Sequence, residues 1–246
     1  MSEPAPIRAL VVDYGGVLTV PIKMAFDAWL DAEQVSREAF RELIEEWRGD
    51  PGNPMHQLET GAISGDAFAL ELAARLRRRD GGGVSAAGLN ERIFAGLAID
   101  YDAFVMLRAA RSAGLKTALL SNSWDFEYPW ADLDPLLDVK IVSGEVGLRK
   151  PDPAIFAMAG ERLGVPLAQC VFVDDIEANI EAARALGMYG VLHTDLPATL
   201  SALVARVPAL APYLPDLPDL PDLPEPGVPD APPASDSPHP HPQPGG

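Results

Sequence analysis

The sequence predicts an α/β fold in which helices cover an open parallel sheet and a block of helices interrupts the chain after the first strand. Two observations support this prediction. A short apolar run at residues 7–12 is followed by a long stretch with helical spacing, at residues 24–113. From residue 116 onward, short apolar runs alternate with amphipathic segments, as they do in the strand–helix units of a parallel sheet.

The first strand is expected at residues 7–12, IRALVV, because this run is short, apolar and ended by a turn signal after Asp13. Residues 24–48 place large apolar side chains at helical spacing among charges, which predicts one helix. Further helices are expected at residues 68–79, ended by three glycines at 81–83, at residues 89–97 and at residues 101–113, stopped by Gly114.

The second half of the chain predicts strands at residues 116–120, 139–142, 170–173 and 188–192, with helices at 152–163 and 177–186. This alternation is typical of a Rossmann-like parallel sheet. We therefore expect an α/β core made of residues 1–19 and 101–205, with a helical cap over residues 20–100. Ligands of such sheets bind at the carboxyl ends of the strands, so polar residues there are the functional candidates.

Residues 206–246 predict a disordered tail rich in proline and aspartate. From Leu214 the chain reads LPDLPDLPDLPEPGVPD, and its proline recurs at first every third residue, the period of a polyproline II helix. Such a composition cannot build a core. A solubilising tail and a binding role for its leucines both stay open, and the sequence does not indicate a partner for it.

The composition limits the classes of partner. The chain has 246 residues, of which 48% are hydrophobic, enough for a sizeable core, and its net charge is −17. That charge argues against nonspecific binding to nucleic acid or to an anionic membrane. The single cysteine, Cys170, cannot form an internal disulfide. The first apolar run stops at Asp13, too early for a signal peptide or a membrane span. We expect a soluble cytoplasmic protein.

Polar residues follow four of the predicted strands or their connecting loops. Taken singly, each has an ordinary explanation as a turn former, a loop residue, a surface lysine or a negative charge before a helix. Together they are expected at one edge of one sheet. They are Asp13 after the first strand, Ser121 and Asn122 after the second, Lys150 after the third, and Asp174 and Asp175 after the fourth.

This set of residues suits phosphoryl transfer. Asp13 and Asp174 offer the hard oxygen ligands that Mg²⁺ prefers, and Asp175 could bind directly or through water. Three neighbouring carboxylates repel one another, so the cluster itself predicts a cation. Ser121, the backbone N–H of Asn122 and the charge of Lys150 could hold phosphate oxygens. Asp13 would then attack phosphorus and form an aspartyl phosphate.

Four stretches, VVDYGGVL, LLSNS, GLRKPD and VFVDDIEAN, resemble the four motifs of the haloacid dehalogenase superfamily of hydrolases. The resemblance covers roughly residues 5–195. The stretches HQLETGAISGDAF and EVGLRKPDPAIF are similar to the branch that includes phosphatase domains fused to epoxide hydrolases and small sugar-phosphate phosphatases.

The resemblance implies a Mg²⁺-dependent phosphatase of small phosphorylated metabolites. By motif, Asp13 is the nucleophile and a metal ligand, and Gly15 is a metal ligand through its carbonyl oxygen. Ser121 and Lys150 bind phosphate, while Asp174 binds Mg²⁺ with support from Asp175. The cap would close over the substrate and exclude water.

Gly15 departs from the family pattern. Most phosphatases of this family carry a second aspartate two residues after the nucleophile, which protonates the leaving oxygen and later activates water. General acid–base help of this kind is worth about 10²–10⁴ in rate. Three interpretations stay open: a phosphatase of esters with good leaving groups, such as acyl or anomeric phosphates; a metal-independent 2-haloacid dehalogenase; or a non-catalytic protein that binds a phosphate compound.

Overall fold

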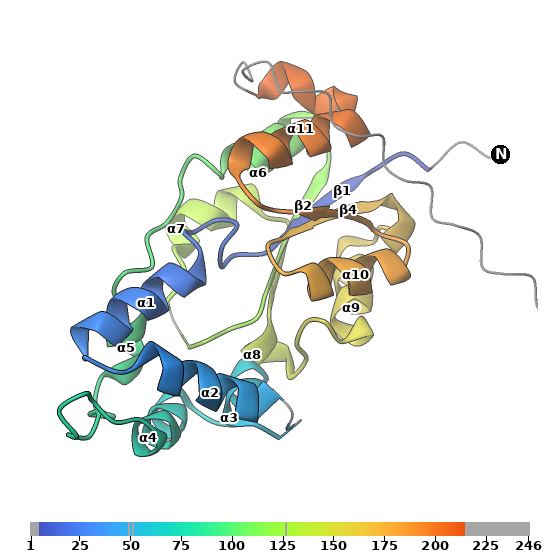
Figure 1. The fold of residues 1–246 in the computed structure, drawn as a ribbon. Coiled ribbons are helices and arrows are strands. Elements are labelled where there is room, and N and C mark those ends of the chain that lie inside the picture. The colour runs from blue at the N-terminus through green and yellow to red at the C-terminus, as the bar shows by residue number, and fades with distance from the viewer. Residues whose placement is uncertain (1–4, 49, 51, 126, 215–246) are drawn as a thin grey trace, which may run out of the picture.

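A five-stranded parallel sheet, in the order β3-β2-β1-β4-β5, forms the centre of the computed structural model, which describes residues 5–48, 50, 52–125 and 127–214 (Figure 1). The register pairs Val12 with Leu119 of β2 and with Val173 of β4. The carboxyl ends of the three central strands therefore lie at the same edge. The strands are β1 (Ala9–Val12), β2 (Lys116–Ser121), β3 (Val139–Val142), β4 (Cys170–Asp174) and β5 (Tyr189–Leu192).

Both faces of the sheet are covered, which explains why its strands read as continuous apolar runs. Leu10 and Val12 of β1 pack into one cluster with α6 (Val105–Ser112) and α11 (Leu196–Arg206). Ala9 and Val11 pack into another, with α9 (Pro153–Leu163) and α10 (Glu177–Ala185). Figure 1 shows the two helix pairs on opposite faces of the sheet. The predicted α/β, Rossmann-like core is confirmed.

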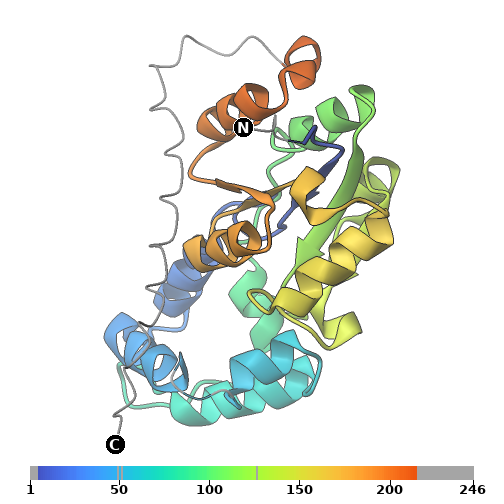
Figure 2. The ribbon, with the colours of Figure 1, turned by 90° about the vertical axis from the view of Figure 1, so that its right-hand side faces the viewer.

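The first five of the described helices after β1 form a separate apolar cluster, called the cap below. They are α1 (Ile22–Ala32), α2 (Arg37–Arg48), α3 (Pro54–Glu59), α4 (Gly65–Arg75) and α5 (Leu89–Phe94). Figure 2 shows them gathered at one end of the molecule. Trp124, from the loop after β2, is buried in the same cluster and joins the cap to the core.

The chain enters and leaves the cap through two segments that lie side by side. Val20 N donates to Ala98 O at 2.9 Å, and Asp100 N donates to Leu18 O at 2.9 Å. Thr19 and Ile99 form an antiparallel bridge between them. Because these bonds fall next to the predicted limits of the cap, residues 20 and 100, they are a natural place for the boundary, which itself stays a prediction.

The predicted helix over residues 24–48 is two helices, α1 and α2. Gln34 adopts a left-handed conformation with φ 56°, and Val35 is fully buried beside it. Ser36 Oγ then accepts from Ala39 N and begins α2. The helical spacing of the apolar residues continues across this break, so periodicity alone could not locate it.

Two helices were not predicted although their first residues carry capping signals. Asn53 accepts from His56 N before α3, and Asp195 accepts from Ala198 N before α11. Each helix also has proline in its first turn. The remaining short elements are α7 (Trp130–Leu133), η1 (Asp134–Leu136), α8 (Ser143–Val146), η2 (Leu167–Gln169) and η3 (Pro208–Tyr213).

Regular structure continues beyond the predicted start of the tail at residue 206. Arg206 ends α11, and η3 follows it with Leu210 buried against the core. The burial of Leu210 against the core accounts for the ordered structure of this segment despite its prolines. Residues 215–246, on which the rest of the tail prediction depends, lie outside the described residues. Within the described part of the chain, no helix is both long and apolar enough to cross a membrane.

The packing between α9 and β4 generates a stability prediction. Phe156 and Phe172 are fully buried and meet edge to face, with ring centroids 5.4 Å apart. Phe156→Ala should lower the free energy of unfolding by about 3–5 kcal/mol, because a large buried side chain leaves a cavity. Urea denaturation followed by circular dichroism measures this change.

The matched control is Leu70→Ala, because Leu70 lies on α4 and is 64% exposed. Its effect should stay within about 0.5 kcal/mol. Equal losses of stability in both variants would contradict the described packing of α9 on the sheet.

Candidate active site

A buried lysine joins two strand ends. Asp13 directly follows β1, and its backbone N–H donates to Val173 O of the neighbouring β4 at 2.9 Å. Asp174 is the last residue of β4. Lys150 Nζ lies 2.7 Å from Asp13 Oδ1 and 2.7 Å from Asp174 Oδ2. All three side chains are buried, so this ion triad lies out of reach of bulk screening.

Each member of the triad is held in place by further hydrogen bonds. Asp13 Oδ1 also accepts from Tyr14 N at 2.7 Å. Asp174 Oδ1 accepts from Ile176 N at 2.8 Å and from Asn179 Nδ2 at 3.0 Å. These bonds leave little freedom to the two carboxylates, and their orientation is set before any ligand binds.

The backbone of Lys150 is clamped by the side chain of Asn122. Asn122 Oδ1 accepts from Lys150 N at 2.8 Å, and Asn122 Nδ2 donates to Lys150 O at 3.1 Å. This pair of bonds ties the loop after β2 to the loop after α8. Asn122 therefore positions the lysine, in addition to the backbone contact with phosphate that the sequence predicts for it.

Asp175 completes a cluster of three acids. Ligand oxygens of Asp13, Asp174 and Asp175 all lie within 4.8 Å of one another. Gly16 allows this approach: it has φ 75°, and a Cβ there would lie 2.2 Å from Asp175 Oδ2. Three carboxylates against one ammonium give a formal charge of −2. Oxygen ligands with this charge fit a divalent cation such as Mg²⁺.

The electrostatics of the cluster reflect its burial. Burial raises the pKa of Asp13 to about 8, with the Asp174 charge adding to the rise and Lys150 opposing it. Burial, followed by the charge of Asp174, raises the pKa of Asp175 to about 6. Burial opposes the charge on Lys150, but the two carboxylates outweigh it and raise the pKa of its ammonium. A bound cation would favour the charged form of all three acids.

A cavity of about 460 Å³ lies above the cluster and is walled by both core and cap. Asp13, Gly15, Lys150 and Asp175 line its core side. The cap contributes Ile22, Met55 and Glu59, among others. Arg149 Nε pairs with Glu59 Oε2 at 2.5 Å and so ties α3 to the residue before Lys150. The position of the cap is thereby coupled to the loop that carries the lysine.

Position 15 is covered by the first helix of the cap. A Cβ on Gly15 would lie 2.4 Å from Ile22 Cδ1 and 3.0 Å from Ile22 Cγ1. An aspartate at this position would thus require Ile22 to move. The absence of an acid at position 15 and the apolar cap residue next to it are therefore two features of the same place in the site.

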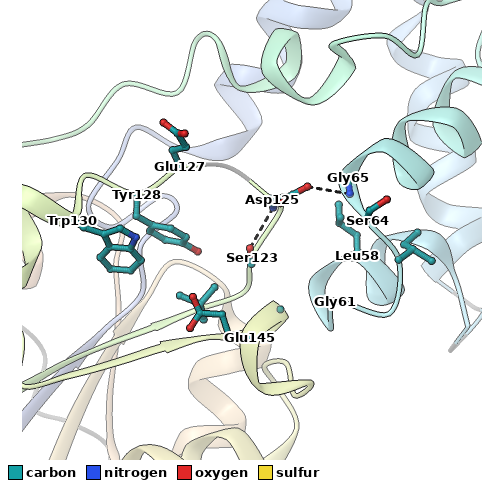
Figure 3. A pocket seen from close by; sticks show the side chains of 13 residues that line it. Leu58, Gly61, Ser64, Gly65, Ser123, Asp125, Glu127, Tyr128, Trp130 and Glu145 are labelled. Atoms are coloured by element: carbon teal, nitrogen blue, oxygen red, sulfur yellow. Dashed lines mark hydrogen bonds between the residues drawn. The ribbon is translucent and has the colours of Figure 1, made fainter.

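A second hollow of about 830 Å³ separates the cap from other core loops (Figure 3). Asp125 reaches across toward the cap, where its carboxylate accepts from Gly65 N at 3.0 Å. The charged residues of its lining are Asp125, Glu127 and Glu145, all acidic. A phosphate would be repelled there, and none of the predicted site residues lines this hollow, so we do not consider it the substrate site.

Most of the predicted site residues meet in the first cavity. Asp13, Lys150, Asp174 and Asp175 form the ion cluster, and the cavity lining includes Gly15 and Asn122. Ser121 is buried at the end of β2, where its Oγ accepts from Tyr128 OH at 3.0 Å. It does not line the cavity.

Three contributors had no assigned role in the sequence analysis. Asn179 could have been assigned from its position one helical turn after the acid pair. The Glu59–Arg149 pair joins residues 90 positions apart, and no local signal links them. Ile22 carries no polar group, so only the fold shows that it covers Gly15.

Comparison with known proteins agrees with these features. A family model described as haloacid dehalogenase-like hydrolase matches residues 7–187. A phosphatase of Mycobacterium tuberculosis is 32% identical over 199 residues, which are 74% of this chain and 85% of that protein. An (S)-2-haloacid dehalogenase of a Pseudomonas species is 34% identical over 199 residues, 74% of this chain and 82% of its own.

The fold is shared with solved structures. A haloacid dehalogenase family enzyme of Bacteroides thetaiotaomicron, solved in complex with magnesium and inorganic phosphate, superposes with a TM-score of 0.59 at 23% identity. The match covers 76% of this chain and 93% of that one. The motifs, the parallel sheet and the family match agree, and the chain belongs to the haloacid dehalogenase-like hydrolases.

Proposed function

We propose that this enzyme is a magnesium-dependent phosphatase that hydrolyses small phosphorylated metabolites through an aspartyl-phosphate intermediate. The observation that carries the proposal is the triad of Asp13, Lys150 and Asp174, with Asp175 beside it, at the floor of a walled cavity. The phosphatase relative and the magnesium and phosphate of the Bacteroides enzyme support it.

The two oxygens of Asp13 have different environments. Lys150 Nζ and Tyr14 N both contact Oδ1. We assign Oδ2 as the atom that attacks phosphorus, since the contacts on Oδ1 fix the plane of the carboxylate. Lys150 and the backbone N–H of Asn122 would hold the phosphoryl oxygens and balance their charge. Ser121 would join them only if its hydroxyl, which accepts from Tyr128 OH, turned toward the cavity.

The acid cluster would hold the metal. Asp13, Asp174, Asp175 and the carbonyl oxygen of Gly15 are the proposed ligands, and bound Mg²⁺ supplies positive charge to the phosphoryl oxygens. The cap residues above the cavity would exclude water while Asp13 attacks. A net charge of −17 and a single cysteine agree with a small-molecule substrate, rather than nucleic acid, and with a cytoplasmic location.

A dehalogenase is the second candidate, because the Pseudomonas relative is 34% identical and Gly15 removes the acid on which phosphatases rely. In that reaction Asp13 attacks carbon and a halide leaves, with no metal required. The formal charge of −2 around Lys150 favours the metal-dependent reaction. Chloride release from 2-chloropropionate in EDTA would support the dehalogenase. Ligand binding without turnover would indicate the non-catalytic protein.

Asp13→Asn should lower the rate of phosphate release from p-nitrophenyl phosphate in Mg²⁺ by about 10⁴-fold or more. This is the scale of loss seen when a catalytic nucleophile is removed. Binding of inorganic phosphate, measured by calorimetry, should persist because Lys150 remains. Asp102→Asn is the control, since Asp102 is an exposed acid of the core, and it should keep full activity. Wild-type rates in Asp13→Asn would rule out this carboxylate as the nucleophile.

Mg²⁺ at a concentration 100 times its Kd should raise the free energy of unfolding of the wild type by about 2.7 kcal/mol, and so raise its melting temperature. Asp174→Asn should lose this gain, because it removes a proposed ligand, and Asp175→Asn should weaken it. Asp102→Asn again serves as control and should keep the full gain. Scanning calorimetry in Mg²⁺ and in EDTA measures the effect. Identical wild-type curves in both buffers would contradict a metal site here.

A further inference from the structure

The walls of the substrate cavity are apolar away from the acid cluster. They comprise Pro21 and Ile22 at the start of α1, Met55 of α3, and Trp124, Pro151 and Ile176 of the core. Trp124 packs edge-on against Phe68 of the cap, with ring centroids 5.8 Å apart, so this wall is supported by the apolar cluster of the cap. A substrate lying above Asp13 would therefore place its non-phosphate part against hydrocarbon.

The polar side chains of the same lining already have partners. Glu59 pairs with Arg149, and Asn122 is bonded through both its amide atoms to the backbone of Lys150. Asn179 donates to Asp174, and Lys23, at the exposed rim, pairs with Asp27. A sugar hydroxyl that enters this cavity loses its hydrogen bonds to water and must compete with these existing bonds for protein partners, which disfavours a polyhydroxy substrate.

Position 15 supplies no proton to the leaving oxygen, because glycine has no acidic side chain, and Ile22 covers this position. A leaving oxygen that receives no proton must depart as an anion, and only a weakly basic oxygen does so readily. The apolar walls and the lack of a proton donor for the leaving oxygen thus favour the same kind of substrate, an apolar phosphate compound with a weakly basic leaving oxygen.

We propose that the preferred substrates are apolar phosphate esters or anhydrides whose leaving oxygen is weakly basic: aryl phosphates and acyl phosphates, rather than sugar phosphates. This inference rests on the phosphatase function proposed above and narrows it. It also excludes anomeric phosphates, which the sequence left open as candidate substrates, because their sugar part does not suit the apolar walls.

The reaction has two steps, formation and hydrolysis of the aspartyl phosphate, and neither requires a general acid. Asp13 Oδ2 forms a bond to phosphorus, and the bond from phosphorus to the leaving oxygen breaks, with its electron pair departing as aryloxide or carboxylate. In the second step water adds to phosphorus and the aspartyl bond breaks, which restores the Asp13 carboxylate. The product phosphate carries both hydrogens of the water and exchanges them with solvent.

Two matched pairs of substrates test separately the effect of apolar area and the effect of the basicity of the leaving oxygen. Benzoyl and acetyl phosphate have similarly acidic leaving groups but differ in apolar area, and benzoyl phosphate should have a kcat/KM at least about tenfold higher. p-Nitrophenyl and benzyl phosphate are of similar size but differ in the basicity of the leaving oxygen. Here the nitrophenyl ester should be faster by about 10²-fold or more. Glucose 1-phosphate should be the poorest of the five substrates.

The cavity wall can be tested directly with Met55→Gln, which keeps the length of the side chain and adds a polar amide. It should reduce the preference for benzoyl over acetyl phosphate by about tenfold. Met24→Gln is the matched control, because Met24 lies on α1, is 58% exposed and does not line the cavity. It should leave the preference unchanged.

The missing acid can be restored with the double variant Gly15→Asp/Ile22→Ala, in which the smaller cap residue makes room for the carboxylate. It should narrow the gap between p-nitrophenyl and benzyl phosphate by about tenfold or more. The single variant Gly15→Asp should gain less, since Ile22 stays in place. Ile22→Ala alone controls for the enlarged cavity and should leave the gap unchanged.

The outcomes distinguish this inference from the function on which it rests. Phosphate release from none of the five substrates in Mg²⁺ would contradict the phosphatase itself. Release from all five at similar rates, or a preference for glucose 1-phosphate, would leave the phosphatase intact and overturn the substrate class. Faster hydrolysis of acetyl than of benzoyl phosphate would refute the role of the apolar walls.

Discussion

The contact of one buried ammonium with two buried carboxylates organises this molecule. Lys150 lies between Asp13 of β1 and Asp174 of β4, and each ion would be costly to bury alone. The parallel register brings the two acids together, while Asn122 holds the lysine from the end of β2. Three neighbouring strands thus contribute to one charge cluster, and a change in their register would leave an ion unpaired.

This cluster also defines what the cap must do. The arm from Lys150 through Arg149 to Glu59 links the catalytic loop to α3, and Ile22 of α1 closes over Gly15. The cap therefore reaches the site at two points with different chemistry, an ion pair and a hydrocarbon side chain. In our account the core provides the residues that carry out the reaction, and the cap determines which leaving groups the enzyme accepts.

Much of this was predictable from the sequence because parallel strands end at a common edge. Asp13, Lys150, Asp174 and Asp175 could be grouped on that basis, before any distance was known. The contacts between remote residues could not. Ile22 was hidden in a helical pattern, Glu59 and Arg149 are far apart in sequence, and the break near Gln34 keeps the apolar spacing of one helix. Each depends on tertiary packing that no local pattern encodes.

The most direct test of the central claim is to locate the covalent intermediate. The enzyme is mixed with p-nitrophenyl phosphate and Mg²⁺, quenched in acid during turnover, digested, and examined by mass spectrometry. Our account predicts a phosphoryl group on the side chain of Asp13. A phosphoryl group on another residue, or an Asp13 peptide that stays unmodified while phosphate is released, would contradict it.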